Sequence, residues 1–91
     1  MKTTVSNMIN SNGNAAANQF ILRNSKVVAF QSYETIIAKR EYKNGVVTID
    51  SNAMGYSKTT SKFLYLFLGM NRKEIERSVK EGIILVEELN K

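Results

Sequence analysis

Two lysines, four hydroxyl side chains and a tyrosine lie close together between positions 57 and 65. If this segment is helical, four of them share one face at i, i+3, i+4 and i+7 spacing: Lys58, Ser61, Lys62 and Tyr65. Lysine supplies positive charge to a phosphate, and tyrosine supplies a flat surface on which a base can stack. The stripe therefore indicates nucleic-acid binding, although an ordinary solvated helix face with a half-packed tyrosine has the same pattern.

The hydroxyl side chains of this segment have two compatible interpretations. They can cap the helix by satisfying the amides of its first turn. The same helix N-terminus can also receive an anion, with lysines beside it. Basic residues of a following helix extend the surface, while Glu74, Glu76 and Glu81 dilute it. The candidate nucleic-acid or anion site is Lys58, Thr59, Thr60, Ser61, Lys62, Tyr65, Arg72 and Lys73.

Catalytic chemistry has little support in this sequence. Residues 55–60 resemble the end of a phosphate-binding P-loop, but Ser57 and Asn52 occupy positions where that loop needs glycine. The chain contains no His and no Cys, which excludes Ser-His-Asp, Cys-His and zinc-finger sites within it. Glu41 and Asp50 are expected on an exposed sheet face as surface charge. We expect no catalytic residue, no metal site and no cofactor.

Composition bounds the class of protein. A chain of 91 residues is one domain at most, and 13 Lys and Arg against 8 Asp and Glu give it a formal charge of +5. This balance favours an acidic partner such as nucleic acid, or describes an ordinary basic domain. The N-terminus has no apolar run of signal-peptide length, and the longest apolar run, residues 63–68, is far shorter than the roughly 20 residues of a membrane span. We expect a cytoplasmic protein without membrane contact.

Four β-strands are predicted before the helical segment. Residues 19–23 and 26–32 flank an Asn24-Ser25 turn, which would pair Leu22 with Val27. Residues 33–42 and 46–50 flank Asn44-Gly45, a strong hairpin signal, which would pair Arg40 with Ile49. In that register the core face carries Ile36, Ala38, Tyr42, Val47 and Ile49. The wet face carries Lys39, Glu41, Thr48 and Asp50, with Lys39 opposite Asp50.

Two helices and a last strand follow. The apolar residues of 63–68, including Leu66, must be buried against the sheet, and Gly69 ends this helix. Asn71 and Glu74 form a capping box for a second, surface helix that ends near Gly82. Residues 83–87 form a last strand that joins the sheet. The predicted fold is α+β with a small, mainly antiparallel sheet in the order β-β-β-β-α-α-β. Residues 19–91 form this domain, and residues 1–18 a flexible or partly helical arm.

Three motifs carry a resemblance: Asn18-Gln19-Phe20, Phe30-Gln31-Ser32-Tyr33 with Ile37-Ala38, and Tyr56-Ser57-x-Thr59-Thr60-x-Lys62 followed by Phe67-Leu68-Gly69. Together they resemble a family of short uncharacterised proteins encoded by tailed phages and other mobile elements of bacteria. The resemblance covers roughly residues 13–70. Members often carry a Trp just before the Tyr-Ser motif, where this chain has Ala53-Met54-Gly55. The resemblance implies a small phage or mobile-element product that acts on nucleic acid or on a host protein.

Two functions are therefore expected. The first is a non-enzymatic protein that binds DNA or RNA through the basic helix face. The alternative is a phage-encoded inhibitor, of the anti-defence or anti-CRISPR type, that binds a host defence or housekeeping protein. Both place the protein in the cytoplasm of the bacterial host. A homodimer can form in either case if residues 83–87 lie at a sheet edge.

Overall fold

The computed structural model describes residues 3–10 and 12–90 and is an α+β fold. One sheet contains the strands in chain order: β1 (Thr4–Ile9), β2 (Ala15–Arg23), β3 (Val27–Ser32), β4 (Thr35–Glu41), β5 (Val47–Asp50) and β6 (Ile84–Glu87). β1 to β5 pair antiparallel, and β6 pairs parallel to β5. The crossover that this parallel pair requires contains the short helix η1 (Ala53–Gly55), α1 (Lys58–Leu68) and α2 (Arg72–Lys80). The predicted order of strands and helices is confirmed, with β1 in addition.

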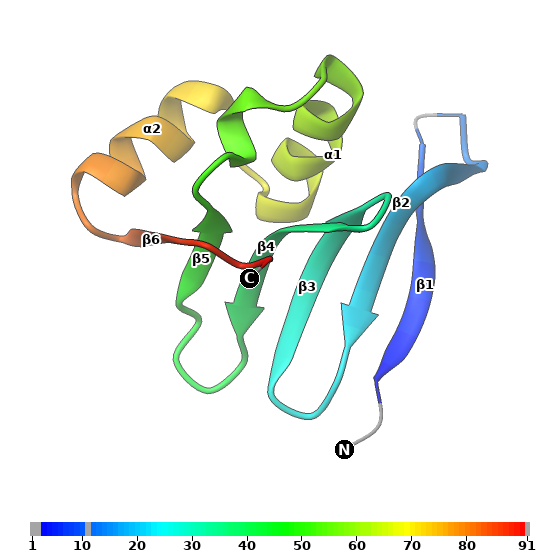
Figure 1. Cartoon of the computed structure of the whole chain (residues 1–91), viewed down its shortest axis with the longest axis horizontal. Helices are drawn as coiled ribbons and strands as arrows, with labels where there is room; N and C mark the ends of the chain where they lie inside the picture. Colours follow the sequence, from blue (N-terminus) through cyan, green and yellow to red (C-terminus); the bar gives the residue numbers. More distant parts are fainter. Residues whose placement is uncertain (1–2, 11, 91) are drawn as a thin grey trace.

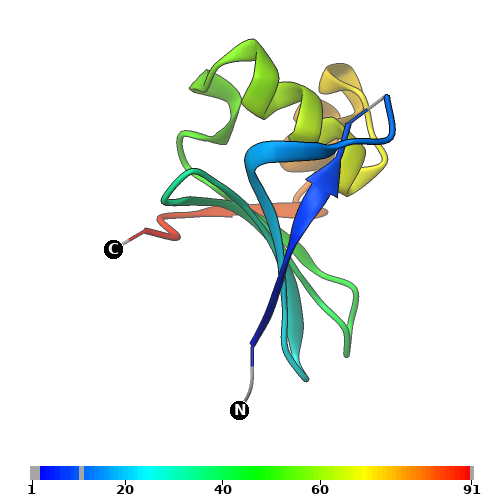
Figure 2. The same ribbon diagram turned by 90° about the vertical axis from the view of Figure 1, so that its right-hand side faces the viewer.

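Both helices lie over the same face of the sheet, toward one end of its strands (Figures 1 and 2). The β2–β3 and β4–β5 hairpins project past the helices at the other end, so their tips are not covered by helix. The molecule therefore has a layered half, where the core lies, and a half formed by sheet alone.

The core lies between α1, α2 and the helix-facing side of the sheet. Phe63, Leu64 and Leu68 of α1 are buried over Phe30 of β3, and the rings of Phe30 and Phe67 lie 6.0 Å apart. The remaining core residues come from several strands, η1 and α2: Ala16, Ile37, Ala38, Ile49, Ala53, Ile75 and Ile84. Burial of these apolar side chains is the main source of stability in a domain this small.

The helix ends follow the capping signals of the sequence. The Ser57 hydroxyl accepts a hydrogen bond from the Thr60 amide and begins α1, and Gly69 ends it in the left-handed conformation at φ 68°. Asn71 and Glu74 form the predicted capping box of α2, with each side chain accepting from the other residue's amide. These local signals fix where the two helices begin and so which side chains α1 turns outward.

Both predicted hairpin registers are wrong by two residues. Leu22 pairs with Ala29 rather than Val27, and Arg40 pairs with Val47 rather than Ile49. In the first hairpin the turn is displaced by one residue, because the Asn24 amide donates to the Val27 carbonyl oxygen and Ser25-Lys26 lie between them. In the second hairpin the connection is longer than two residues, because the Glu41 amide donates to the Val46 carbonyl oxygen. The side-chain oxygen of Asn24 accepts from two amides to close the first connection, and that of Asn44 accepts from the Val46 amide in the second. A shift of two residues keeps each side chain on its face, so the face assignment of most strand residues survives.

The N-terminal segment is a strand and not the expected flexible or partly helical arm. β1 pairs with β2 from Thr4, opposite Arg23, to Ile9, opposite Ala15. Its residues are mostly exposed, so backbone pairing rather than burial of side chains holds it in the sheet. Residues 1, 2 and 11 of that expected arm, and residue 91 of the expected domain, lie outside the described residues.

Three expectations about burial are also wrong. Thr48 and Asp50, expected on a wet face, are 3% and 4% exposed, and Lys39 pairs with Thr48 rather than Asp50. Tyr42, expected in the core, is 50% exposed because the longer turn carries it out of the strand. Leu66 is 56% exposed because it lies on the outward side of α1.

Candidate nucleic-acid interface

The outward face of α1 borders a shallow hollow of about 340 Å³, which we name the α1 hollow. Its lining residues are Tyr56, Lys58, Ser61, Lys62, Tyr65 and Arg72. The helix turns the predicted stripe to one side, and the first residue of α2 adds a guanidinium group. Five of the eight predicted site residues are therefore brought together around one concave surface, and Tyr56 joins them from the segment before α1.

The charge of the α1 hollow is positive. Lys58, Lys62 and Arg72 are exposed, whereas Tyr65 is half-buried, so it is held by packing with part of its ring open to solvent. None of the lining residues is a carboxylate. Glu76 contacts Arg72 at 3.6 Å in an exposed i, i+4 pair, which neutralises part of the guanidinium charge.

A second, more apolar hollow of about 470 Å³ continues along α1. It shares Lys62 and Tyr65 with the α1 hollow and adds Leu66, Gly69, Met70 and Asn71. The exposed side chain of Leu66 thus lies beside a cation and an aromatic ring. This surface can contact an apolar group, such as the face of a base, next to a group that contacts a phosphate.

Three predicted site residues do not line the α1 hollow. Thr60 is only 5% exposed, and its hydroxyl hydrogen-bonds to Ser32 Oγ at 3.0 Å and to Ser57 Oγ at 3.2 Å. Thr60 therefore ties the start of α1 to β3, and the expectation that it faces a ligand is wrong. Thr59 and Lys73 are exposed but lie away from the hollow's lining.

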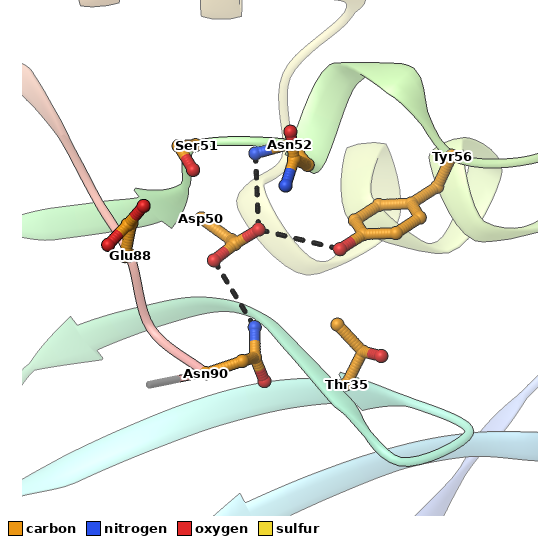
Figure 3. Close-up of a pocket in the computed structure, with 7 residues that line it drawn as sticks. All are labelled: Thr35, Asp50, Ser51, Asn52, Tyr56, Glu88 and Asn90. Atoms are coloured by element: carbon orange, nitrogen blue, oxygen red, sulfur yellow. Dashed lines mark hydrogen bonds between the residues drawn. The ribbon is translucent and has the colours of Figure 1, made fainter.

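Asp50 forms a hydrogen-bonded centre that the sequence did not predict (Figure 3). Its Oδ2 accepts from the Asn52 amide at 3.1 Å and from the Tyr56 hydroxyl at 3.4 Å. Its Oδ1 accepts from the Leu89 amide at 3.0 Å and from the Asn90 side-chain amide at 3.2 Å. A carboxylate has about four acceptor positions. Asp50 uses them to hold the end of β5, the segment before α1 and the chain after β6 together.

The electrostatics of this centre follow from the same contacts. Burial acts to raise the pKa of the Asp50 carboxyl, but the hydrogen bonds from Leu89, Asn52, Asn90 and Tyr56 outweigh it, so the pKa lies below its ordinary value of 3.8. Burial, the Asp50 charge and the hydrogen bond to that charge raise the pKa of Tyr56 above 10.0. Both groups keep their ordinary charge states at neutral pH, as a structural contact requires.

Asp50 and its neighbours also line a polar hollow of about 380 Å³. Because the Asp50 oxygens are already bonded within the chain, the carboxylate stabilises the fold and offers little to a ligand. Tyr56 lines this hollow as well as the α1 hollow, so Asp50 positions one wall of the candidate interface. The sequence carried no usable signal for this role, because two of the donors are 39 and 40 residues away along the chain.

Two other properties bear on the class of protein. Neither helix in the described part of the chain has the length and hydrophobicity to cross a bilayer. Within residues 3–10 and 12–90, no three acidic, His or Cys side chains are grouped so that they could hold a metal ion.

No curated protein and no solved structure matches the chain. A family of unknown function, DUF8033, matches residues 3–83, a range that includes the three motifs described above. The match agrees with the expected resemblance to a family of uncharacterised proteins. Because it covers most of the chain, this protein belongs to DUF8033.

Proposed function

We propose that this protein is a small, non-enzymatic binding protein of a phage or mobile element that binds nucleic acid through the α1 hollow. The observation that supports this most directly is the composition of the hollow's lining: three cations, two tyrosines and one serine, without a carboxylate. Cations contact phosphates without regard to sequence, and exposed aromatic rings stack with unpaired bases. The adjoining apolar hollow around Leu66 extends the surface available to bases.

Single strands fit this surface better than duplex. The two tyrosines can stack only with bases that are not already stacked within a duplex. The hollow is shallow and follows one side of α1, and no described element of the chain projects from it in the way that a recognition helix enters a major groove. We therefore expect sequence-tolerant binding to single-stranded DNA or RNA.

The test is binding of labelled single-stranded oligonucleotides to the purified protein at low salt and at physiological salt. Binding should weaken steeply with salt, because phosphate contacts release counterions. Lys58→Ser/Lys62→Ser should lower the low-salt affinity roughly tenfold. Tyr65→Leu, which keeps an apolar side chain but removes the ring, should lower it roughly fivefold or more.

A charge-matched control separates a local contact from loss of net charge. Arg77→Ser/Lys80→Ser removes two exposed cations from α2 that do not line the α1 hollow. This variant should keep most of the affinity. An equal loss in both double variants would contradict a defined site, and no binding of any DNA or RNA at low salt would remove the proposal.

A second candidate function, inhibition of a host protein, is favoured by the side of the sheet that faces away from the helices. The strand register aligns Leu22, Ala29, Lys39, Thr48 and Leu85 across five strands on that side. Leu85 on the edge strand β6 is 43% exposed, and an exposed apolar side chain at a sheet edge suits a protein partner.

The test of this second function is purification of partners from nuclease-treated host lysate. A stoichiometric protein that is retained by the wild type and lost with Leu85→Ser would favour this function. If host proteins are retained only when the lysate is not treated with nuclease, the result would contradict this function.

A further inference from the structure

The tips of the two projecting hairpins carry a second concentration of positive charge. The tips adjoin, because the Tyr42 amide donates to the Lys26 carbonyl oxygen at 3.0 Å. Together with the strand ends that support them, they carry five basic residues and one acid: Arg23, Lys26, Lys39, Arg40, Lys43 and Glu41. Two other acids lie at the far end of these strands: Asp50 ends β5, and Glu34 lies in the β3–β4 turn. The hairpin end of the sheet is therefore strongly basic.

These side chains surround a concave surface of their own. A hollow of about 500 Å³ lies between the tips and is lined by Ser25, Lys26, Glu41, Tyr42 and Lys43. The Tyr42 ring is half exposed there, so an aromatic face stands beside two ammonium groups. The α1 hollow also combines cations with an aromatic ring, whereas the tip hollow includes a carboxylate, Glu41, in addition.

Two arginines extend this surface along the helix-facing side of the sheet. Arg23 pairs with Val28, and Val28 pairs with Arg40, so all three side chains share one face. Phe30, two residues along from Val28, contacts Phe67 of α1, which identifies that face. The hairpins project past the helices at this end of the sheet (Figures 1 and 2). Arg23 is exposed and Arg40 is half-buried.

Packing in the hydrophobic core does not explain why these side chains are at the tips. The two lysines and the tyrosine are exposed and lie outside the core cluster: Lys26, Tyr42 and Lys43. Like charges concentrated at one end of a small domain destabilise it through repulsion. A polyanion bound across the tips would relieve that repulsion.

We propose that the hairpin tips are a second nucleic-acid contact, in which Arg23, Lys26, Arg40 and Lys43 bind phosphates and Tyr42 stacks with a base. This inference rests on the proposed function, because both surfaces would bind the same class of ligand. It adds a surface at the end of the sheet away from α1. Glu41, the carboxylate in the tip hollow, limits the affinity of this surface by repelling phosphate.

The first test is removal of the two lysines that line the tip hollow. Lys26→Ser/Lys43→Ser should lower low-salt affinity for single-stranded DNA roughly tenfold and reduce the slope of log affinity against log salt by about 1.4. Arg77→Ser/Lys80→Ser, which removes the same charge elsewhere, should leave most of the affinity in place. Equal effects of the two double variants would overturn the inference.

The second test is a gain of affinity, which a folding defect cannot imitate. Glu41→Gln removes the negative charge from the tip hollow and keeps the size of the side chain. It should raise low-salt affinity about threefold. Unchanged or weaker binding would overturn a phosphate contact at this position.

The two proposals fail in different ways. If the wild type binds no nucleic acid, the proposed function fails and this inference fails with it. If the wild type binds, and Lys58→Ser/Lys62→Ser weakens binding whereas the tip variants change nothing, the proposed function stands and the inference is overturned. If only the tip variants matter, the inference stands and the α1 hollow is the wrong site.

Discussion

Asp50 shows how one side chain can determine the position of a functional surface without belonging to it. Its carboxylate joins the end of β5 to Tyr56, which lines the α1 hollow, and to Leu89 and Asn90 beyond β6. Asn90 also exchanges hydrogen bonds with the Ile36 backbone, so the chain after β6 is fastened to β4 as well. Asp50 is thus the residue at which three separate segments meet.

Replacing this carboxylate should destabilise the protein. Asp50→Asn keeps the shape of the side chain but removes its charge. It also replaces one acceptor oxygen with an NH2 group, which can only donate. We expect a loss of about 1–3 kcal/mol in the free energy of unfolding at pH 7, because the four donors lose a charged acceptor. Urea unfolding measures this loss. Glu87→Gln, on the exposed residue that pairs with Asp50 across β5 and β6, is the matched control and should change stability little.

The contribution of Asp50 to the free energy of unfolding should also depend on pH. The pKa of Asp50 is lower in the folded state than its ordinary value, so its contribution is fully present above the unfolded-state pKa of about 4. The contribution is lost as the pH falls through the folded-state pKa. The difference in stability between wild type and Asp50→Asn should therefore be constant from pH 7 to about pH 5 and shrink below about pH 4. A difference that persists unchanged at low pH would contradict the assigned role.

At the scale of the elements, the sequence predicted helices more accurately than strand pairing. Helix ends depend on residues close together in the chain, such as Ser57 with Thr60 and Asn71 with Glu74, so local patterns identify them. The hairpin registers depend on the positions and lengths of the connections. The Asn24 side chain closes a turn that is displaced by one residue, the Asn44 side chain closes a longer connection, and nothing local separates these alternatives from the predicted turns. β1 was missed because it is mostly exposed and has no apolar alternation to reveal it.

The candidate site was predictable to the same extent. The stripe at 58, 61, 62 and 65 follows from helical periodicity, and Arg72 follows as the first residue of the next helix. The burial of Thr60 was not predictable, because it depends on Ser32, 28 residues away in the chain. The basic hairpin tips also depend on tertiary placement, since Lys26 and Lys43 adjoin only when the two hairpins pack side by side.

The N-cap of α1 allows stability and binding to be separated. Ser57→Asp should keep the cap, because Asp accepts the Thr60 amide as Ser does and its charge suits a helix N-terminus. The same carboxylate lies next to Lys58 and should repel phosphate, lowering low-salt affinity roughly fivefold. Ser57→Ala should do the opposite. It should cost about 1 kcal/mol of stability and leave affinity unchanged at temperatures where the protein is folded.

Thermal unfolding and oligonucleotide binding of the two variants test this pair. Weakened binding by Ser57→Ala, with normal binding by Ser57→Asp, would mean that the order of the helix start matters more than its charge. That outcome would contradict an electrostatic contact at the N-terminal end of the α1 hollow.

At the scale of the whole molecule, two separate surfaces combine cations with an aromatic ring. The α1 hollow lies on the helical layer, and the hairpin tips lie at the end of the sheet away from the helices (Figure 1). The molecule measures 35 × 32 × 23 Å along its principal axes, so a strand that contacts both surfaces must span most of it. The length of the nucleic acid should therefore determine how many cations take part.

The salt dependence of the affinity measures how many cations contact phosphates. Three cations line the α1 hollow, and the hairpin tips offer Arg23, Lys26, Arg40 and Lys43 in addition. An oligonucleotide of about six bases reaches one surface and should show a slope of log affinity against log salt near −2, whereas one of about 30 bases reaches both and should approach −5. Between about 50 mM and about 200 mM salt, the affinity should then fall about 20-fold for the short strand and about 900-fold for the long one. Equal slopes for the two lengths would show that a single strand uses only one surface.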